Sequence, residues 1–80
     1  MDWRKWRRGE YHSRGRDLGY VIVPKKNGKY FVEARQAGGA KHQMPFQDFE
    51  SPEAAMEWVD AHERELAKTR ERMIANSISL

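Results

Sequence analysis

The stretch 49–60 constrains the fold most, because it combines a well-marked helix start with the first part of an apolar stripe. Ser51 is a preferred N-cap residue, and Pro52 suits the first helical position because its missing N–H needs no partner there. Glu53 suits the positive end of the helix dipole. The sequence therefore predicts a helix from Pro52 to about Ala75, roughly 36 Å long at 1.5 Å per residue.

Apolar residues recur along this helix at steps of three and four positions, so they line one face. They are Ala55, Trp58, Val59, His62, Leu66 and Met73. Such a face needs an apolar surface beneath it, and we expect Phe49 and Trp58 to hold the helix against a sheet. His62 fits better as a neutral histidine within this packing than as a metal ligand or a base. Asn76 can end the helix, which leaves a short tail over 77–80.

Three segments before the helix have the composition of strands. They cover residues 20–24, 30–35 and 41–46. The first is β-branched and apolar, the second alternates between apolar and polar residues, and the third is weaker. Pro45 cannot donate a ladder hydrogen bond, so the third segment should lie at an edge and the second in the middle. The predicted fold is α+β, with a three-stranded antiparallel sheet packed against one long C-terminal helix.

Asn27-Gly28 is a strong hairpin signal between the first two strands, but it leaves two registers open. A two-residue turn would pair Val23 with Val32, whereas a three-residue loop with a bulge at Gly28 would turn Ile22 inward. In either case the second strand should direct alternate residues to opposite faces. The helix-facing set is Tyr30, Val32 and Ala34, and the outer set is Phe31, Glu33 and Arg35. A second turn is expected at 36–40.

Length and composition bound the class of protein. Eighty residues allow one domain with a modest core. The chain has no cysteine, so disulfides and thiolate sites are excluded and an intracellular location is the default. No stretch approaches the roughly 20 apolar residues of a membrane span, and the N-terminus does not have the pattern of a signal peptide. We expect a cytoplasmic protein without a membrane partner.

Charge is distributed unevenly along the chain. Residues 1–47 hold 11 Lys and Arg against 4 acids, while residues 48–80 hold 4 basic residues against 8 acids. The net charge is therefore +7 in the first part and −4 in the second. A basic sheet beside an acidic helix would orient a polyanion toward the sheet. The same charge blocks can also serve only to keep a small protein soluble.

The segment 1–18 mixes aromatic and basic residues without a strand or helix pattern, so we expect an arm ahead of a domain over 19–76. Arginine can neutralise phosphates and tryptophan can stack on unpaired bases, which suits a nucleic-acid-binding tail. Alternatively, Trp3 and Trp6 could fold back and cover apolar surface of the sheet. The sequence leaves both options open.

No pattern of catalytic residues is evident. The three histidines fall on different segments without ligand spacing, and the sequence has no Gly-rich phosphate loop and no nucleophile elbow. The carboxylates on the helix fit a solvated flank better than an acid–base pair. We therefore expect a non-enzymatic protein that needs no cofactor and no metal.

Two motifs resemble a DNA-binding fold that combines a three-stranded sheet with a helix. Residues 28–35, Gly-Lys-Tyr-Phe-Val-Glu-Ala-Arg, are similar to the second strand of the plant Apetala/ethylene-response domain. The second motif has the spacing of the N-terminal arm-binding domains of phage tyrosine integrases, and it consists of Phe49, Ser51, Ala54, Ala55 and Trp58. The resemblance covers about residues 19–66. It implies that the outer sheet face enters the major groove of duplex DNA.

By this resemblance, Glu33 and Arg35 would face the groove, and Lys29 and Lys41 would lie near phosphates. The basic arm and the hairpin turn add further candidates. The full nucleic-acid-binding set is Arg4, Arg7, Arg8, Arg14, Arg16, Lys25, Lys26, Lys29, Glu33, Arg35 and Lys41. The favoured hypothesis is a small phage-like or prokaryotic accessory protein that binds double-stranded DNA.

A protein-interaction module is the alternative hypothesis, because the first strand lacks arginines and the outer face carries Phe31. Such a module could be a phage-encoded factor that binds and modulates a host protein, or it could form a homodimer. The candidate contact residues for this function are Trp3, Trp6, Tyr20, Ile22 and Phe31.

Overall fold

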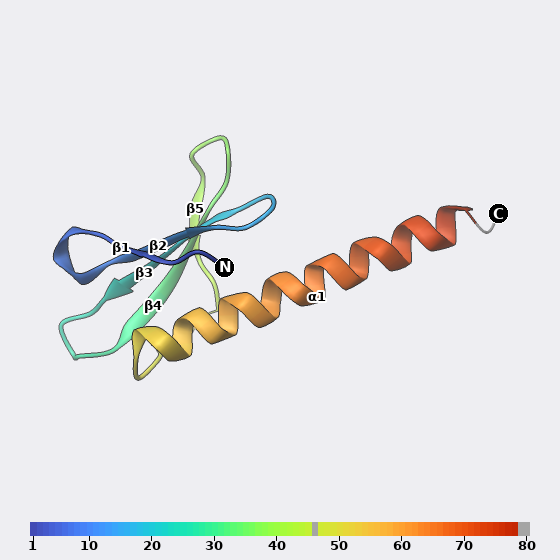
Figure 1. The fold of residues 1–80 in the computed structure, drawn as a ribbon. Coiled ribbons are helices and arrows are strands. Elements are labelled where there is room, and N and C mark those ends of the chain that lie inside the picture. The colour runs from blue at the N-terminus through green and yellow to red at the C-terminus, as the bar shows by residue number, and fades with distance from the viewer. Residues whose placement is uncertain (46, 79–80) are drawn as a thin grey trace.

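The structure, a computed structural model, describes residues 1–45 and 47–78, with side chains as far as Met73. The elements in chain order are β1 (Arg4–Lys5), the short 3-10 turn η1 (Arg7–Gly9), β2 (Tyr11–Arg14), β3 (Gly19–Pro24), β4 (Tyr30–Arg35), β5 (Lys41–Gln43) and α1 (Pro52–Ile78). The first part of α1 lies against the sheet, and its second part extends well beyond it (Figure 1). The predicted α+β class, an antiparallel sheet with a C-terminal helix, is confirmed.

The sheet has five strands in the order β1-β2-β3-β4-β5, so the prediction of three strands is wrong. Part of the segment expected to form an arm folds into a hairpin, in which Arg4 pairs with His12 and Lys5 with Tyr11. Tyr11 is the one large apolar residue of β2, so the alternation that marks a half-buried strand is weak in the sequence. The added strands make β3 the central strand, although β4 lies between β3 and β5 as expected.

The β3–β4 loop has the three-residue form. The Lys25 N–H donates to the Lys29 carbonyl at 2.7 Å and closes the loop, and Gly28 adopts a φ of +83°. This left-handed conformation favours glycine. The loop pairs Ile22 with Val32, and both side chains enter the core beneath α1. Of the two registers that the sequence allows, the structure therefore has the one with Ile22 inward.

The β4–β5 loop repeats this geometry. The Gln36 N–H donates to the Ala40 carbonyl at 2.9 Å, and Gly39 has a φ of +90°. β5 ends at Gln43 and is shorter than predicted, but it does lie at the sheet edge that Pro45 indicated. The two loops keep β3, β4 and β5 in the same alternation of faces.

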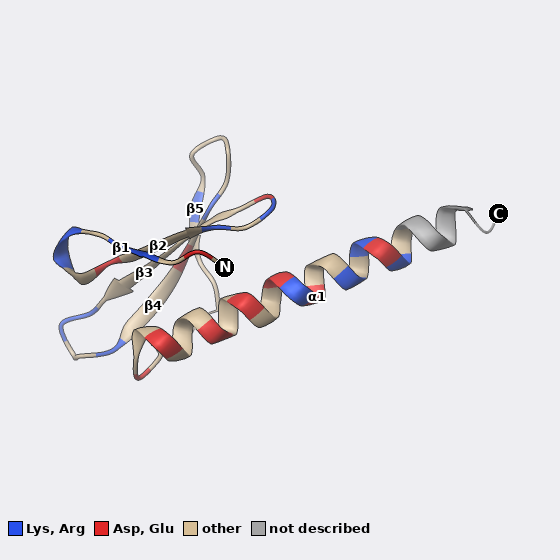
Figure 2. Cartoon of the chain, in the orientation of Figure 1, with Lys and Arg blue, Asp and Glu red and all other residues tan. Residues whose placement is uncertain are grey.

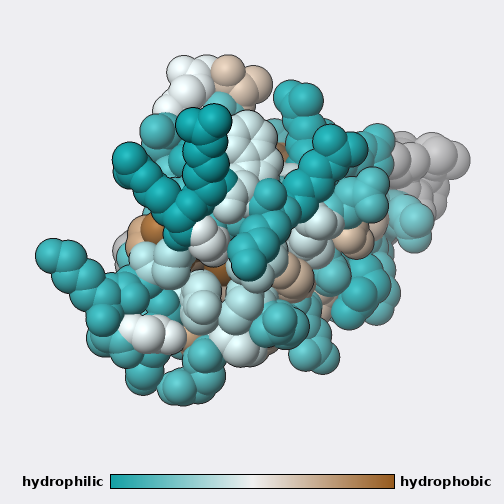
Figure 3. Space-filling model, turned by 60° about the vertical axis from the view of Figure 1, so that its left-hand side comes forward, coloured by the Kyte–Doolittle hydropathy of each residue, from teal (hydrophilic) through white to brown (hydrophobic). Residues whose placement is uncertain are grey.

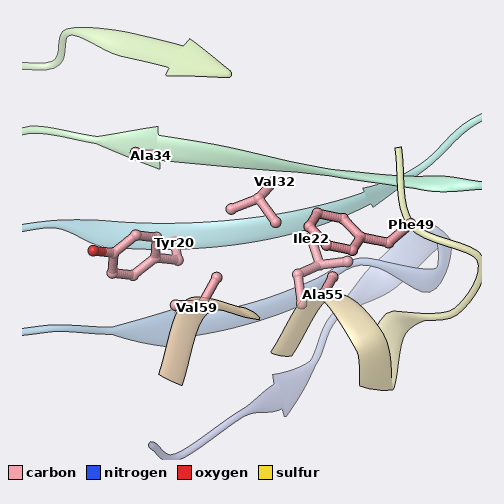
Figure 4. Packing of buried hydrophobic residues seen from close by; sticks show 7 residues of the cluster. All are labelled: Tyr20, Ile22, Val32, Ala34, Phe49, Ala55 and Val59. Carbon is pink, nitrogen blue, oxygen red and sulfur yellow. The ribbon is translucent and has the colours of Figure 1, made fainter. Parts of the chain in front are cut away.

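The core lies between the sheet and the first turns of α1 (Figure 4). It consists of Tyr20, Ile22, Val32, Ala34, Phe49, Ala55 and Val59. Phe49 also bridges to Tyr30 through two backbone hydrogen bonds of 2.7 and 2.9 Å. The Phe49 ring lies 6.3 Å from the ring of Trp58. These contacts hold the start of α1 on the sheet, as predicted.

α1 begins at Pro52 as predicted, and Ser51 caps it, because its Oγ accepts a hydrogen bond from the Ala54 N–H at 3.1 Å. The helix continues to Ile78, past its expected end. Residues 77 and 78 are therefore helical, and the rest of the predicted tail lies outside the described residues. In the part of the chain that the structure describes, no helix is both long and apolar enough to cross a membrane.

Candidate nucleic-acid interface

The sheet face opposite α1, termed the outer face, carries the candidate binding residues. The register places Phe31, Glu33 and Arg35 on this face, as predicted, because Val32 and Ala34 between them are buried under α1. Hydrophilic side chains project around small hydrophobic patches on the side of the molecule that Figure 3 shows.

One line of residues across the outer face is cationic. Arg14, Gly19, Arg35 and Lys41 are successive partners on β2, β3, β4 and β5. We term Arg14, Arg35 and Lys41 the cationic row. Glycine has no side chain, and a hollow of about 510 Å³ opens beside Gly19, lined in part by Arg14, Arg16 and Arg35. Basic residues lie on the strands and turns of the sheet, whereas acidic residues mark the first half of α1 (Figure 2).

Arg35 is the inner member of the cationic row, and Glu33 orients it. Arg35 Nε lies 3.1 Å from Glu33 Oε1, and the two side chains are 39% and 20% exposed. A carboxylate bound at Nε leaves the terminal guanidinium nitrogens of Arg35 for another acceptor. The pair expected to face a DNA groove therefore lies together on the outer face, with part of the guanidinium open to a ligand.

A second basic cluster lies at the opposite end of the strands, in η1 and the β3–β4 loop. Its members are Arg7, Arg8, Lys25, Lys26 and Lys29. Two of these side chains are paired with acids that precede α1, Lys25 with Asp48 at 2.8 Å and Lys29 with Glu50 at 3.3 Å. The structure thus places the predicted basic residues other than Arg4, which lies on β1, at two ends of the sheet. The cationic row and Arg16 lie together at one of these ends.

The residues predicted for a protein contact do not share one surface. Tyr20 and Ile22 are 1% and 0% exposed beneath α1, so they are not available for such a contact. The reason is the three-residue loop, which turns both side chains toward the helix. Trp3 also lies on the helix side, where its Nε1 donates to Asp60 Oδ1 at 3.4 Å. Phe31 lies on the outer face and is partly buried.

Trp6 projects from the end of β1 and is 58% exposed. Its indole stacks on the His12 ring, with centroids 4.4 Å apart and planes inclined by 21°. His12 Nε2 lies 3.0 Å from Glu10 Oε1. A hollow of about 590 Å³ beside this stack is lined by residues that include Arg4 and Arg14. Sequence reasoning missed His12 as a site residue, and only the weak alternation of β2 could have placed it beside Trp6.

The turn between β2 and β3 carries Arg16, follows Arg14 directly, and is held by α1. The Tyr20 hydroxyl, from the start of β3, donates to Glu63 Oε1 at 2.5 Å. Burial, this hydrogen bond and the charge of Glu63 together raise the pKa of Tyr20 well above its usual range. An ion pair joins Asp17 of the turn to Arg70 of the helix. α1 therefore positions one end of the cationic row from the far side of the sheet.

The chain matches no protein-family model, no curated protein and no solved structure. The resemblance to DNA-binding domains of the sheet-plus-helix type therefore stays a prediction. Among the described residues, no group of three or more His, Asp or Glu is placed to hold a metal ion. The arrangement of charges on the outer face is the basis for a functional proposal.

Proposed function

We propose that this protein is a small, non-enzymatic DNA-binding accessory protein of the phage-like or prokaryotic type, which binds duplex DNA through its outer face. The cationic row carries the proposal, because side chains from β2, β4 and β5 share one register. With strands about 4.8 Å apart, the row is about 14 Å wide from β2 to β5. This width is close to that of the major groove, about 12 Å.

The position of each residue in the row suggests its role. Arg14 and Lys41 stand at the two ends, where they can reach phosphates at the edges of the groove. Arg35 stands between them, and its free guanidinium nitrogens can donate to the acceptors of a guanine. Phosphate contacts supply much of the affinity and weaken as salt is added. The second basic cluster adds contacts that do not depend on base sequence.

Gly19 provides the sharpest test, because a side chain there would fill the hollow without disturbing the fold. The nearest atom to an added Cβ would be the Arg35 carbonyl oxygen, at 3.9 Å. Gly19→Glu therefore places a carboxylate between Arg14 and Arg35. We expect it to weaken the binding of a fluorescently labelled duplex at least ~10-fold in anisotropy titrations at low salt, a loss of about 1.4 kcal/mol.

Ala67→Glu is the matched control, because it adds the same charge at an exposed position on α1. We expect this variant to bind the duplex nearly as well as the unaltered protein. Equal losses in the two variants would show that only net charge matters and would contradict a site on the outer face. A protein that binds no duplex at low salt would overturn the proposal altogether.

A protein-interaction module is the second candidate, and the part of α1 beyond the sheet favours it. That part of the helix extends away from the sheet (Figure 1). Met73, in α1, is 65% exposed. Exposed apolar side chains on an amphipathic helix are a common basis for docking. Light scattering should detect a dimer if this helix pairs with a second copy of the chain. A strict monomer at high protein concentration would argue against that pairing.

A further inference from the structure

Trp6 is a preorganised aromatic platform on the outer face. Its backbone N–H donates to the Glu10 carbonyl at 2.7 Å, which closes the β1–β2 hairpin around η1. Its indole rests on the His12 ring, and Glu10 in turn contacts His12 at 3.0 Å. The side chain nevertheless remains 58% exposed. Because His12 covers one side of the indole, the other side is available for stacking.

The hollow beside Trp6 has the charge and size that a nucleotide requires. It measures about 590 Å³, and its lining includes two arginines, Arg4 and Arg14, and one acid, Asp2. Binding sites for small ligands commonly fall between about 300 and 1,000 Å³. Arg14 also lines the hollow of the cationic row. If a base of a nucleic-acid strand lies on Trp6, the phosphates next to it could therefore contact Arg14. The phosphates that follow could then contact the rest of the cationic row.

We propose that Trp6 stacks on an unpaired nucleobase, so that the preferred partner is a duplex with a single-stranded extension rather than a blunt duplex. This inference rests on the proposed function, because the cationic row would hold the adjoining duplex. Within a duplex, neighbouring base pairs cover the faces of each base, and an aromatic side chain can stack only on a base that is unpaired or terminal. The indole and the two arginines together supply what single-strand binding needs, a stacking surface and a cationic path.

The test compares three labelled DNA ligands by fluorescence anisotropy at one salt concentration. They are a blunt duplex, the same duplex with a short single-stranded extension, and the single strand alone. We expect the unaltered protein to bind the extended duplex at least ~10-fold more tightly than the blunt duplex, as one stacked base can supply. Trp6→Ala should reduce this preference to less than about twofold, because it should weaken binding of the extended duplex far more than binding of the blunt duplex.

Trp6→Phe is the matched variant, because it retains an aromatic ring and should keep most of the preference. Thermal unfolding checks that each variant is folded. We expect both variants to fold, because the Trp6 side chain is mostly exposed. Equal affinity for both duplexes, or equal losses for both in Trp6→Ala, would overturn the inference while leaving the proposed function standing. Binding of the single strand without any duplex binding, lost in Trp6→Ala, would support the stacking site and overturn the proposed function.

Discussion

Gly15 lies where the β2–β3 turn meets α1, and neighbouring atoms already occupy the space that a side chain would need there. An added Cβ would collide with the Glu63 carboxylate and lie 2.9 Å from Tyr20 Cε2. The carboxylate is not free to move away, because the Tyr20 hydroxyl donates to it at 2.5 Å. We expect Gly15→Ala to lower the free energy of unfolding in urea by about 1–3 kcal/mol. Gly38→Ala is the control, since open space surrounds Gly38, and an equal loss there would contradict this account.

Tyr20 makes stability depend on pH in the alkaline range. Burial, the hydrogen bond to Glu63 and the Glu63 charge raise the pKa of Tyr20 in the folded protein, whereas a tyrosine in an unfolded chain has a pKa of about 10. The folded state holds the hydroxyl proton of Tyr20 more tightly than the unfolded state does. The contribution of Tyr20 to the free energy of unfolding is therefore complete below about pH 10 and is lost as the pH rises further. Between about pH 8 and pH 11, the unaltered protein should lose more thermal stability than Tyr20→Phe. Equal losses of thermal stability in the unaltered protein and in Tyr20→Phe over this pH range would contradict this role of Tyr20.

At the scale of elements, the start of α1 was predictable because a helix cap is local. Ser51 and Pro52 are adjacent in sequence, and the structure has the cap that they indicate. β1 and β2 were not predictable in this way. β1 has two residues and both are exposed, so it carries no apolar signal of its own. Such strands form because a neighbouring strand pairs with them, and pairing is not visible in a single segment.

The members of the candidate site were predictable from charge, but their alignment was not. Arg14, Arg35 and Lys41 come from three strands, and their register depends on loop lengths that the sequence left open. Gly19 and His12 were missed for a different reason. A glycine between two arginines and a histidine beneath a tryptophan matter only once the strands are paired.

At the scale of the whole molecule, the separation of charge gives the protein a direction relative to a polyanion. The sheet and its turns are basic, and the acidic first half of α1 lies on the other side of the core (Figure 2). A duplex approaching the outer face would meet the cationic row first, while the helix repels it on the opposite side. The proposed binding therefore uses one face of the sheet, and the packing of α1 uses the other.

This arrangement predicts how salt affects binding. Each phosphate contact contributes about 0.9 to the slope of log affinity against log salt concentration. Arg14→Gln should reduce the steepness of that slope by about 0.9 for all sequences. Arg35→Gln should also relax any sequence preference, because the role proposed for Arg35 is to read a base. Arg64→Gln on α1 is the control, and a change in slope equal to that of Arg14→Gln would contradict the assigned orientation.

The two three-residue loops have a consequence for how the chain can vary. The β3–β4 loop and the β4–β5 loop each have three residues. Because the two loops have equal length, the residues that point outward on one strand pair with outward residues on the next, through all three strands. Deleting one residue from the first loop would shift the pairing by one position and exchange the two faces of β4. Val32 would then meet solvent and Arg35 would meet the core. Exposed side chains in these loops can therefore be replaced by other residue types. The length of each loop cannot change, because a change in length would exchange the inward and outward residues of the next strand.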